Sequence, residues 1–179
     1  LDDLLIATET FDHHLQVIEN VCQELYRHGM KLNPKKCTFA KPNTEYLGFI
    51  VGDCDGTTGY APVPDKIKAL SLTKPPKTAK EVRQFCGSLQ YYNGMIPNLN
   101  IKLSPLHKGA AKKPFEMTTE MMNAFKIVQS MLAEKILLSF PDFSLEFKLT
   151  TDASYAGASG VLVQCRPDGT EEIIQLFSK

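Results

Sequence analysis

The first part of the chain carries an apolar pattern typical of a strand and then one typical of a helix. A short apolar run at residues 4–8 predicts a strand. Behind it, apolar side chains recur every three or four positions up to about His28. This spacing predicts an amphipathic helix that is capped by Thr10 or Asp12 and stopped by Gly29.

Short strands are predicted next. Segments 37–40 and 45–51 have strand composition, and the lysine, proline and asparagine at 41–44 favour a hairpin turn between them. A second turn at Gly56 leads into a short strand at 59–61. The pattern therefore predicts a small antiparallel sheet.

From Pro62 the spacing becomes helical. A short helix is expected through Leu72, and the capping box formed by Thr78 and Glu81 opens a longer one. A polar stretch rich in glycine and lysine at 108–114 is interpreted as a linker. The middle of the chain is therefore expected to be a small helical unit.

The last part begins with a helix and ends in strands. Helical spacing starts at Thr118 or Thr119, and strand patterns follow at 146–152, 159–165 and 171–179. A meander of three antiparallel strands needs a covering layer to be stable. Helices combined with antiparallel strands place the chain in the α+β class.

Composition excludes several classes of protein. Apolar residues make up 43% of the 179 positions and charged residues 22%, which argues against disorder and coiled coil. No apolar run is long enough to cross a bilayer and no signal peptide is visible, so no membrane partner is expected. Five cysteines without a C-x-x-C pair argue against a disulfide framework and a zinc site. An intracellular, reducing location fits these features.

The formal net charge of zero hides an uneven distribution. Residues 61–113 carry ten basic and two acidic side chains, a net charge of +8, whereas the segments before and after each carry −4. A basic middle between acidic flanks fits a module that contacts a polyanion and lies between metal-binding modules. Charge alone leaves open the alternative that this is a solvated, lysine-rich helical surface without a polyanion partner.

Candidate metal ligands lie near the two ends of the chain. Asp2 and Asp3 precede the first apolar run, and a tight turn can direct such a carboxylate pair toward Mg²⁺. The alternative is an exposed acidic pair with no role. Asp152 ends a predicted strand, where a lone aspartate is more often a strand-end cap than a ligand.

Several motifs in order resemble the polymerase polyprotein of gypsy-type LTR retrotransposons. The opening LDDLLIA is similar to the family's aromatic-x-Asp-Asp turn, and YLGFIV to its primer-grip hairpin. KPPKTAKEVRQFCGSLQYYNGMIPN and SPLHKG resemble the thumb, and FPDFSLEFKLTTDASYAGASGVLVQ the entry into ribonuclease H. The similarity extends over essentially the whole chain, and a chance match of five or six motifs in one order is not a reasonable explanation.

The resemblance implies three regions. These are a reverse transcriptase palm remnant with a primer-grip-like hairpin at 1–61, a helical thumb at 62–113, and a connecting helix with the first strands of a ribonuclease H-like domain at 114–179. It implies RNA-directed DNA polymerisation and hydrolysis of RNA in RNA–DNA hybrids for the parent polyprotein. Both activities are expected to be incomplete in this piece, because further aspartates of each site are expected outside it.

The resemblance also assigns partners and site residues. An RNA template, a DNA primer, their hybrid and a dNTP are the implied partners, in a cytoplasmic particle or the nucleus. Asp2, Asp3 and Asp152 are the implied catalytic ligands of two-ion Mg²⁺ sites. Nucleic-acid contacts are expected at the hairpin and near a helix N-terminus, where the dipole favours phosphate. The residues of this expected interface are Tyr46, Leu47, Gly48, Lys74, Lys77, Lys80 and Arg83.

Two positions depart from the family pattern. The basic pair that usually follows the two tyrosines of the thumb is replaced by Asn93-Gly94, and a family tryptophan by Met117. Losing the basic pair removes expected phosphate contacts. A rival hypothesis is therefore a domesticated or relic fragment that binds nucleic acid without catalysis.

Overall fold

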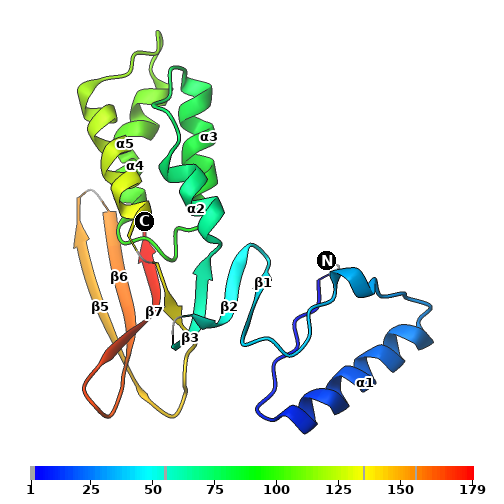
Figure 1. The fold of residues 1–179 in the computed structure, drawn as a ribbon. Helices are drawn as coiled ribbons and strands as arrows, with labels where there is room; N and C mark the ends of the chain where they lie inside the picture. The colour runs from blue at the N-terminus through cyan, green and yellow to red at the C-terminus, as the bar shows by residue number, and fades with distance from the viewer. Residues whose placement is uncertain (1–2, 55, 135, 156) are drawn as a thin grey trace.

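The computed structural model describes residues 3–54, 56–134, 136–155 and 157–179. It combines helices with two antiparallel sheets, which confirms the α+β class. The helices are α1 (Phe11–Arg27), the 3-10 turn η1 (Pro34–Lys36), α2 (Pro64–Ser71), α3 (Ala79–Gln90), α4 (Leu99–Ala111) and α5 (Thr119–Leu132). The strands are β1 (Asn43–Tyr46), β2 (Phe49–Cys54), β3 (Thr57–Pro62), β4 (Leu138–Ser139), β5 (Glu146–Ser154), β6 (Gly157–Cys165) and β7 (Glu171–Ser178). Figure 1 shows α2 to α5 as a bundle at one end of the two sheets.

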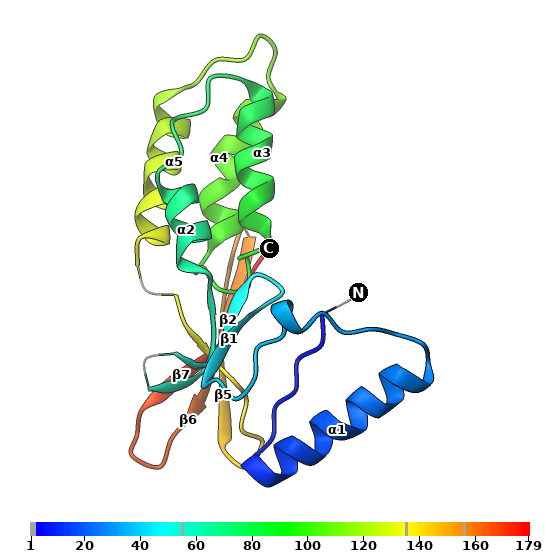
Figure 2. The same ribbon diagram turned by 45° about the vertical axis from the view of Figure 1, so that its right-hand side comes forward.

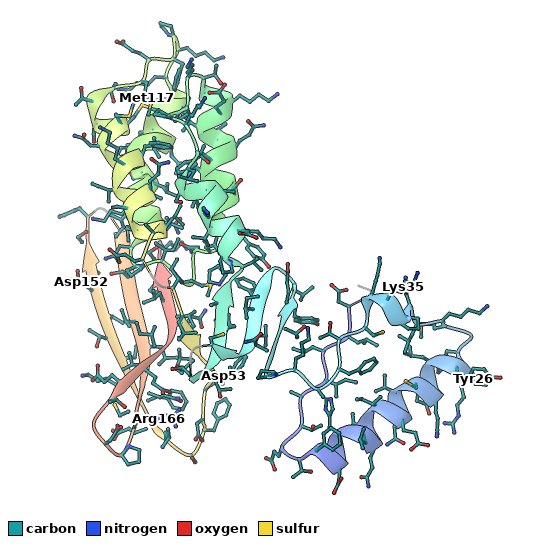
Figure 3. All side chains as sticks on the ribbon, viewed as in Figure 1. Tyr26, Lys35, Asp53, Met117, Asp152 and Arg166 are labelled. Atoms are coloured by element: carbon teal, nitrogen blue, oxygen red, sulfur yellow. The ribbon has the colours of Figure 1, made fainter. Side chains whose placement is uncertain are left out.

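The N-terminal segment lies apart from the bundle and the sheets. As predicted, α1 is capped by Thr10, whose hydroxyl accepts a hydrogen bond from the backbone N–H of His13. None of its residues is buried, and Figure 3 shows Tyr26 on the far side of the segment from the bundle. The strand predicted at 4–8 is wrong, because neither sheet of the described residues provides a neighbouring strand to exchange hydrogen bonds with it.

The first sheet has the strand order β1-β2-β3-β4, antiparallel throughout. Its hairpin differs from the prediction, since the turn is not at 41–44 but at Leu47–Gly48, between the paired residues Tyr46 and Phe49. The strand expected at 37–40 is also wrong, because the chain bends at Ala40, which has a positive φ of 49°. The two-residue β4 was not predicted and ties the second half of the chain to this sheet.

The helical bundle contains the main core. The predicted cap of α3 is present, with the Thr78 hydroxyl accepting from the backbone N–H of Glu81 at 3.2 Å. The linker predicted at 108–114 is wrong up to Ala111, because α4 continues through it. Pro105 and Gly109 lie inside this helix, and because both residue types disfavour helix, the sequence pattern does not indicate it. Fully buried side chains from three helices fill the core: Val82, Leu89, Leu99, Leu103, Leu106, Met121, Phe125, Val128 and Leu132.

The second sheet is the predicted meander of β5, β6 and β7. Its last strand docks on the bundle through hydrogen bonds. The Leu176 N–H donates to the Gly94 carbonyl at 3.0 Å, and the Asn100 side-chain amide donates to the Ser178 carbonyl at 2.7 Å. Figure 2 shows the sheets meeting the same end of the bundle. Within the described ranges, no helix is both long and apolar enough to cross a bilayer.

Candidate nucleic-acid interface

The tip of the β1–β2 hairpin has an unusual backbone. Leu47 and Gly48 both have positive φ, at 46° and 81°, as a two-residue type I′ turn requires. Glycine and asparagine adopt this conformation readily, whereas leucine does so rarely. Leu47 is nevertheless 55% exposed, so burial does not compensate for its backbone cost. Tyr46, which precedes the turn, is half-buried.

Two helices of the bundle hold this hairpin. The Tyr91 hydroxyl, at the end of α3, donates a hydrogen bond to the Leu47 carbonyl, and its ring stacks on Phe49 with centroids 4.9 Å apart. From α2, Lys66 forms an ion pair with Glu45 at 3.0 Å, and this hydrogen bond raises the pKa of Lys66. The hairpin tip, α2 and the end of α3 together line an open groove of about 560 Å³.

Two of the predicted lysines, Lys77 and Lys80, lie at the other end of α3, whereas Lys74 follows Thr73, whose carbonyl accepts from the Gln129 side chain in the last turn of α5. Lys74 and Lys77 are exposed in the segment before the helix, and Lys80 is exposed in its first turn. A helix of 12 residues is about 18 Å long. Lys77 and Lys80 are therefore separated from the hairpin tip by about the length of one helix, and the structure does not bring them into contact with it.

The start of α3 is already occupied by its own side chains. The Glu81 carboxylate accepts from the backbone N–H of Lys77 at 2.6 Å. A carboxylate there opposes the attraction of the helix dipole for phosphate, so any phosphate contact rests on the lysine side chains. Arg83, the fourth predicted residue, donates to the Ala110 carbonyl at 2.9 Å and so caps the last turn of α4.

The predicted carboxylates do not meet in the described part of the chain. Asp2 lies outside the described residues, Asp3 is exposed, and Asp152 is exposed on β5 opposite Ser159 (Figure 3). Carboxylate oxygens suit hard divalent ions. Among the described residues, however, no group of three or more histidine, cysteine, aspartate or glutamate side chains could hold a metal ion. These residues therefore supply single candidate ligands rather than a complete site.

Asn93 and Gly94, which depart from the family pattern, have a role that no pattern in the sequence indicates. Gly94 accepts the hydrogen bond of Leu176, and Asn93 accepts one from the Ser178 hydroxyl at 3.4 Å. This pair thus contacts the second sheet. Tyr91 was also missed as a contact of the hairpin, because its partner lies 44 positions earlier and no local pattern links them.

Two family models match the chain. The reverse transcriptase (RNA-dependent DNA polymerase) model matches residues 1–51, and the model of the RNase H-like domain found in reverse transcriptase matches residues 117–179. The boundaries expected at 61 and 113 fall between these two matches and stay a prediction.

Curated relatives are Pol polyproteins of transposons. Those of transposons gypsy and 297 from Drosophila melanogaster are each 34% identical over 92% of this chain, and Transposon Tf2-3 polyprotein from Schizosaccharomyces pombe is 28% identical over 94%. The chain spans only 17%, 15% and 12% of their lengths, respectively. These matches do not favour the rival hypothesis of a non-catalytic protein.

Solved structures share the fold. The foamy viral protease-reverse transcriptase in complex with RNA/DNA hybrid aligns over 97% of this chain and 23% of its own, with a TM-score of 0.77 and 21% identity. The same protein with dsDNA aligns over 96% of this chain and 35% of its own, with a TM-score of 0.78 and 21% identity. With two family models in the order of the polyprotein and relatives along nearly its whole length, the chain belongs to the reverse transcriptase and RNase H-like region of gypsy-type retrotransposon Pol polyproteins.

Proposed function

We propose that this chain contributes the surface that holds the primer–template duplex in a polyprotein that polymerises DNA on an RNA template and hydrolyses RNA in RNA–DNA hybrids. The observation that carries this proposal is the hairpin tip. An exposed leucine in a backbone conformation that favours glycine is the kind of local strain that functional sites retain. The solved structures that share the fold of this chain contain an RNA/DNA hybrid or dsDNA, which supports nucleic acid as the partner.

In this proposal the two ends of α3 make different contacts with the duplex. At one end, the Leu47 side chain and the open groove offer an apolar contact to the primer strand. At the other, Lys77 and Lys80, together with Lys74 in the segment before the helix, offer charge to phosphates, which positions a duplex without reading its sequence. The 18 Å or so between them corresponds to about five base pairs at 3.4 Å each, so one duplex lying along α3 can reach both.

Catalysis is proposed for the polyprotein rather than for this chain alone. Asp2 and Asp3 are proposed as ligands of the polymerase ions, and Asp152 as a ligand of the nuclease ions. Other parts of the polyprotein would supply the remaining carboxylates and the dNTP site. Mg²⁺ would supply charge stabilisation at the transferring phosphate. We propose the same intracellular settings for the polyprotein, a cytoplasmic particle or the nucleus.

Neutralising the basic end of α3 is expected to weaken duplex binding and its salt dependence together. In the variant Lys74→Gln, Lys77→Gln, Lys80→Gln, up to three phosphate contacts are lost. The slope of log affinity against log salt should then fall in magnitude by about 2–3, since each contact contributes about 0.9. The slope is measured by fluorescence anisotropy, with a labelled RNA–DNA hybrid titrated with protein at several salt concentrations from about 50 to 200 mM.

The matched control for this triple variant removes the same charge elsewhere. Lys31, Lys35 and Lys36 are exposed in the N-terminal segment, and their glutamine variant should leave the slope within about 1 of the wild type. Equal slopes for the two triple variants would show that binding depends on net charge, and would remove the basic end of α3 from the interface.

Replacing Leu47 by glycine separates stability from binding. Glycine adopts the left-handed conformation without the leucine penalty of about 1–2 kcal/mol, partly offset by its greater freedom in the unfolded chain. Thermal stability should therefore stay equal or rise. Hybrid affinity should fall by about tenfold if the leucine side chain is buried on binding, since such burial contributes about 1.5–3 kcal/mol when complete.

Ala40→Gly is the control for Leu47→Gly, because Ala40 also has positive φ and lies outside the hairpin. It should relieve the same backbone cost and leave hybrid affinity unchanged. A Leu47→Gly variant that binds as tightly as the wild type would contradict a primer contact at the hairpin tip.

A further inference from the structure

The hairpin that carries Leu47 is supported by its sheet on one side only. β1 has four residues and pairs only with β2 in the described sheet, so it is an edge strand. β2, the other strand of the hairpin, is central, and all six of its residues pair with β3, including Phe49 opposite Pro62. The hairpin turn also contains a leucine in the left-handed region. On the β1 side of the tip, contacts from outside the sheet therefore add to the pairing with β2.

One side chain from the bundle contacts both sides of the turn. Tyr91 follows α3 directly and is 52% exposed, so it is not a core residue. Its hydroxyl donates to the carbonyl of Leu47 at the tip, and its ring stacks on Phe49, the first residue after the turn, at an interplanar angle of 13°. The ring and the hydroxyl thus hold both sides of the turn from the thumb.

The turn is shaped for this close approach. A Cβ atom at Gly48 would lie 3.1 Å from the Tyr91 hydroxyl oxygen and 3.4 Å from the Lys66 ammonium nitrogen, closer than or at the limit of ordinary contacts. Glycine therefore serves two needs at this position, the positive φ of 81° and the space for Tyr91. The Lys66–Glu45 ion pair adds a second, exposed tie from α2.

We propose that Tyr91 is a positioning residue, whose hydroxyl fixes the Leu47–Gly48 turn against α3 so that the hairpin tip and the basic end of the helix form one rigid surface. This inference rests on the proposed function, in which the tip contacts the primer strand. Its consequence is that the two contact regions keep a constant separation, so that a duplex meets both without first ordering the hairpin. Preorganisation of this kind raises affinity by lowering the ordering cost of binding.

The test is Tyr91→Phe, which removes the hydroxyl and keeps the ring on Phe49. Backbone ¹⁵N order parameters at Gly48 and Phe49 should fall from values near 0.85, typical of rigid backbone, toward 0.6 or less, while those of α3 stay unchanged. Hybrid affinity should fall by about fivefold, the usual effect of one lost hydrogen bond. The salt slope should stay unchanged, because no charge is removed.

Tyr92→Phe is the matched control. Tyr92 is the adjacent residue, is buried, and also packs against Phe49, with centroids 6.2 Å apart. Within the described residues its hydroxyl makes no hydrogen bond to the hairpin, so its removal should leave the order parameters of the turn unchanged.

The outcomes separate this inference from the proposed function. A rigid hairpin in Tyr91→Phe, or equal loosening in Tyr92→Phe, would overturn the positioning role. So would a mobile hairpin with unchanged hybrid affinity, because the turn would then be held for a reason other than binding. If the wild-type chain does not bind the hybrid, the proposed function fails, and the order parameters still decide whether Tyr91 holds the turn.

Discussion

Phe125→Ala is expected to destabilise the chain by about 3–5 kcal/mol, the usual cost of truncating a fully buried phenylalanine. Phe125 is 1% exposed in the centre of the bundle, and its ring packs against Phe85 at a centroid distance of 4.8 Å. The cavity left by alanine would separate α3 from α5. Domains of this size have only about 5–15 kcal/mol of stability, so hybrid binding at 37 °C should fall with the folded fraction. Urea denaturation followed by circular dichroism measures the loss.

Phe143→Ala gives the same chemical change at an exposed position. Phe143 is 85% exposed and contacts Phe147, with centroids 5.9 Å apart, so its truncation should cost at most about 1 kcal/mol. Similar losses in the two alanine variants would contradict the assignment of the stability of the chain to the bundle core.

The second large effect concerns the two sets of carboxylates, tested in a polyprotein that contains this chain. Asp152→Asn should reduce hydrolysis of RNA in a hybrid by about a thousandfold and leave primer extension in place. Asp3→Asn should reduce primer extension by a similar factor and leave hydrolysis of the RNA in place. Asparagine keeps the size and removes the charge. A metal ion contributes several kcal/mol to catalysis, and each 1.4 kcal/mol changes a rate tenfold. Gel assays of both activities on one labelled hybrid measure the two rates.

Asp168→Asn is the control for these carboxylates. Asp168 is exposed in the turn before β7, where its carboxylate accepts from the Thr170 N–H at 2.9 Å, and an asparagine oxygen can accept the same bond. Both activities should survive this change. Loss of primer extension in Asp152→Asn, or retained RNA hydrolysis, would remove Asp152 from the proposed nuclease site.

Local signals in the sequence predicted most helices. Thr10, Thr78 and Thr118 each cap a helix, as their side chains and positions indicated, because an N-cap depends on residues only three positions away. α4 escaped prediction for a physical reason. Pro105 and Gly109 are poor helix formers, and tertiary burial of Leu103 and other side chains on its inner face outweighs their local preference.

The hairpin could not be placed from the sequence alone. A leucine at the first position of a type I′ turn contradicts the usual turn signals, whereas the lysine, proline and asparagine at 41–44 imitate them. The contacts that build the candidate site are even less predictable from the sequence. The hydrogen bond between Tyr91 and the turn joins positions 44 apart. The hydrogen bond from Arg83 to the carbonyl of Ala110 joins positions 27 apart. Only the fold brings such residues together.

A hydrogen-exchange footprint of the whole chain, with and without a saturating RNA–DNA hybrid at low salt, decides whether the hairpin tip and the start of α3 contact the duplex. Amides of the hairpin tip at 45–50 and of the segment at 74–83 are expected to become protected, while those of α1 do not change. Binding without protection at either end of α3, or protection confined to other elements, would contradict the proposed interface.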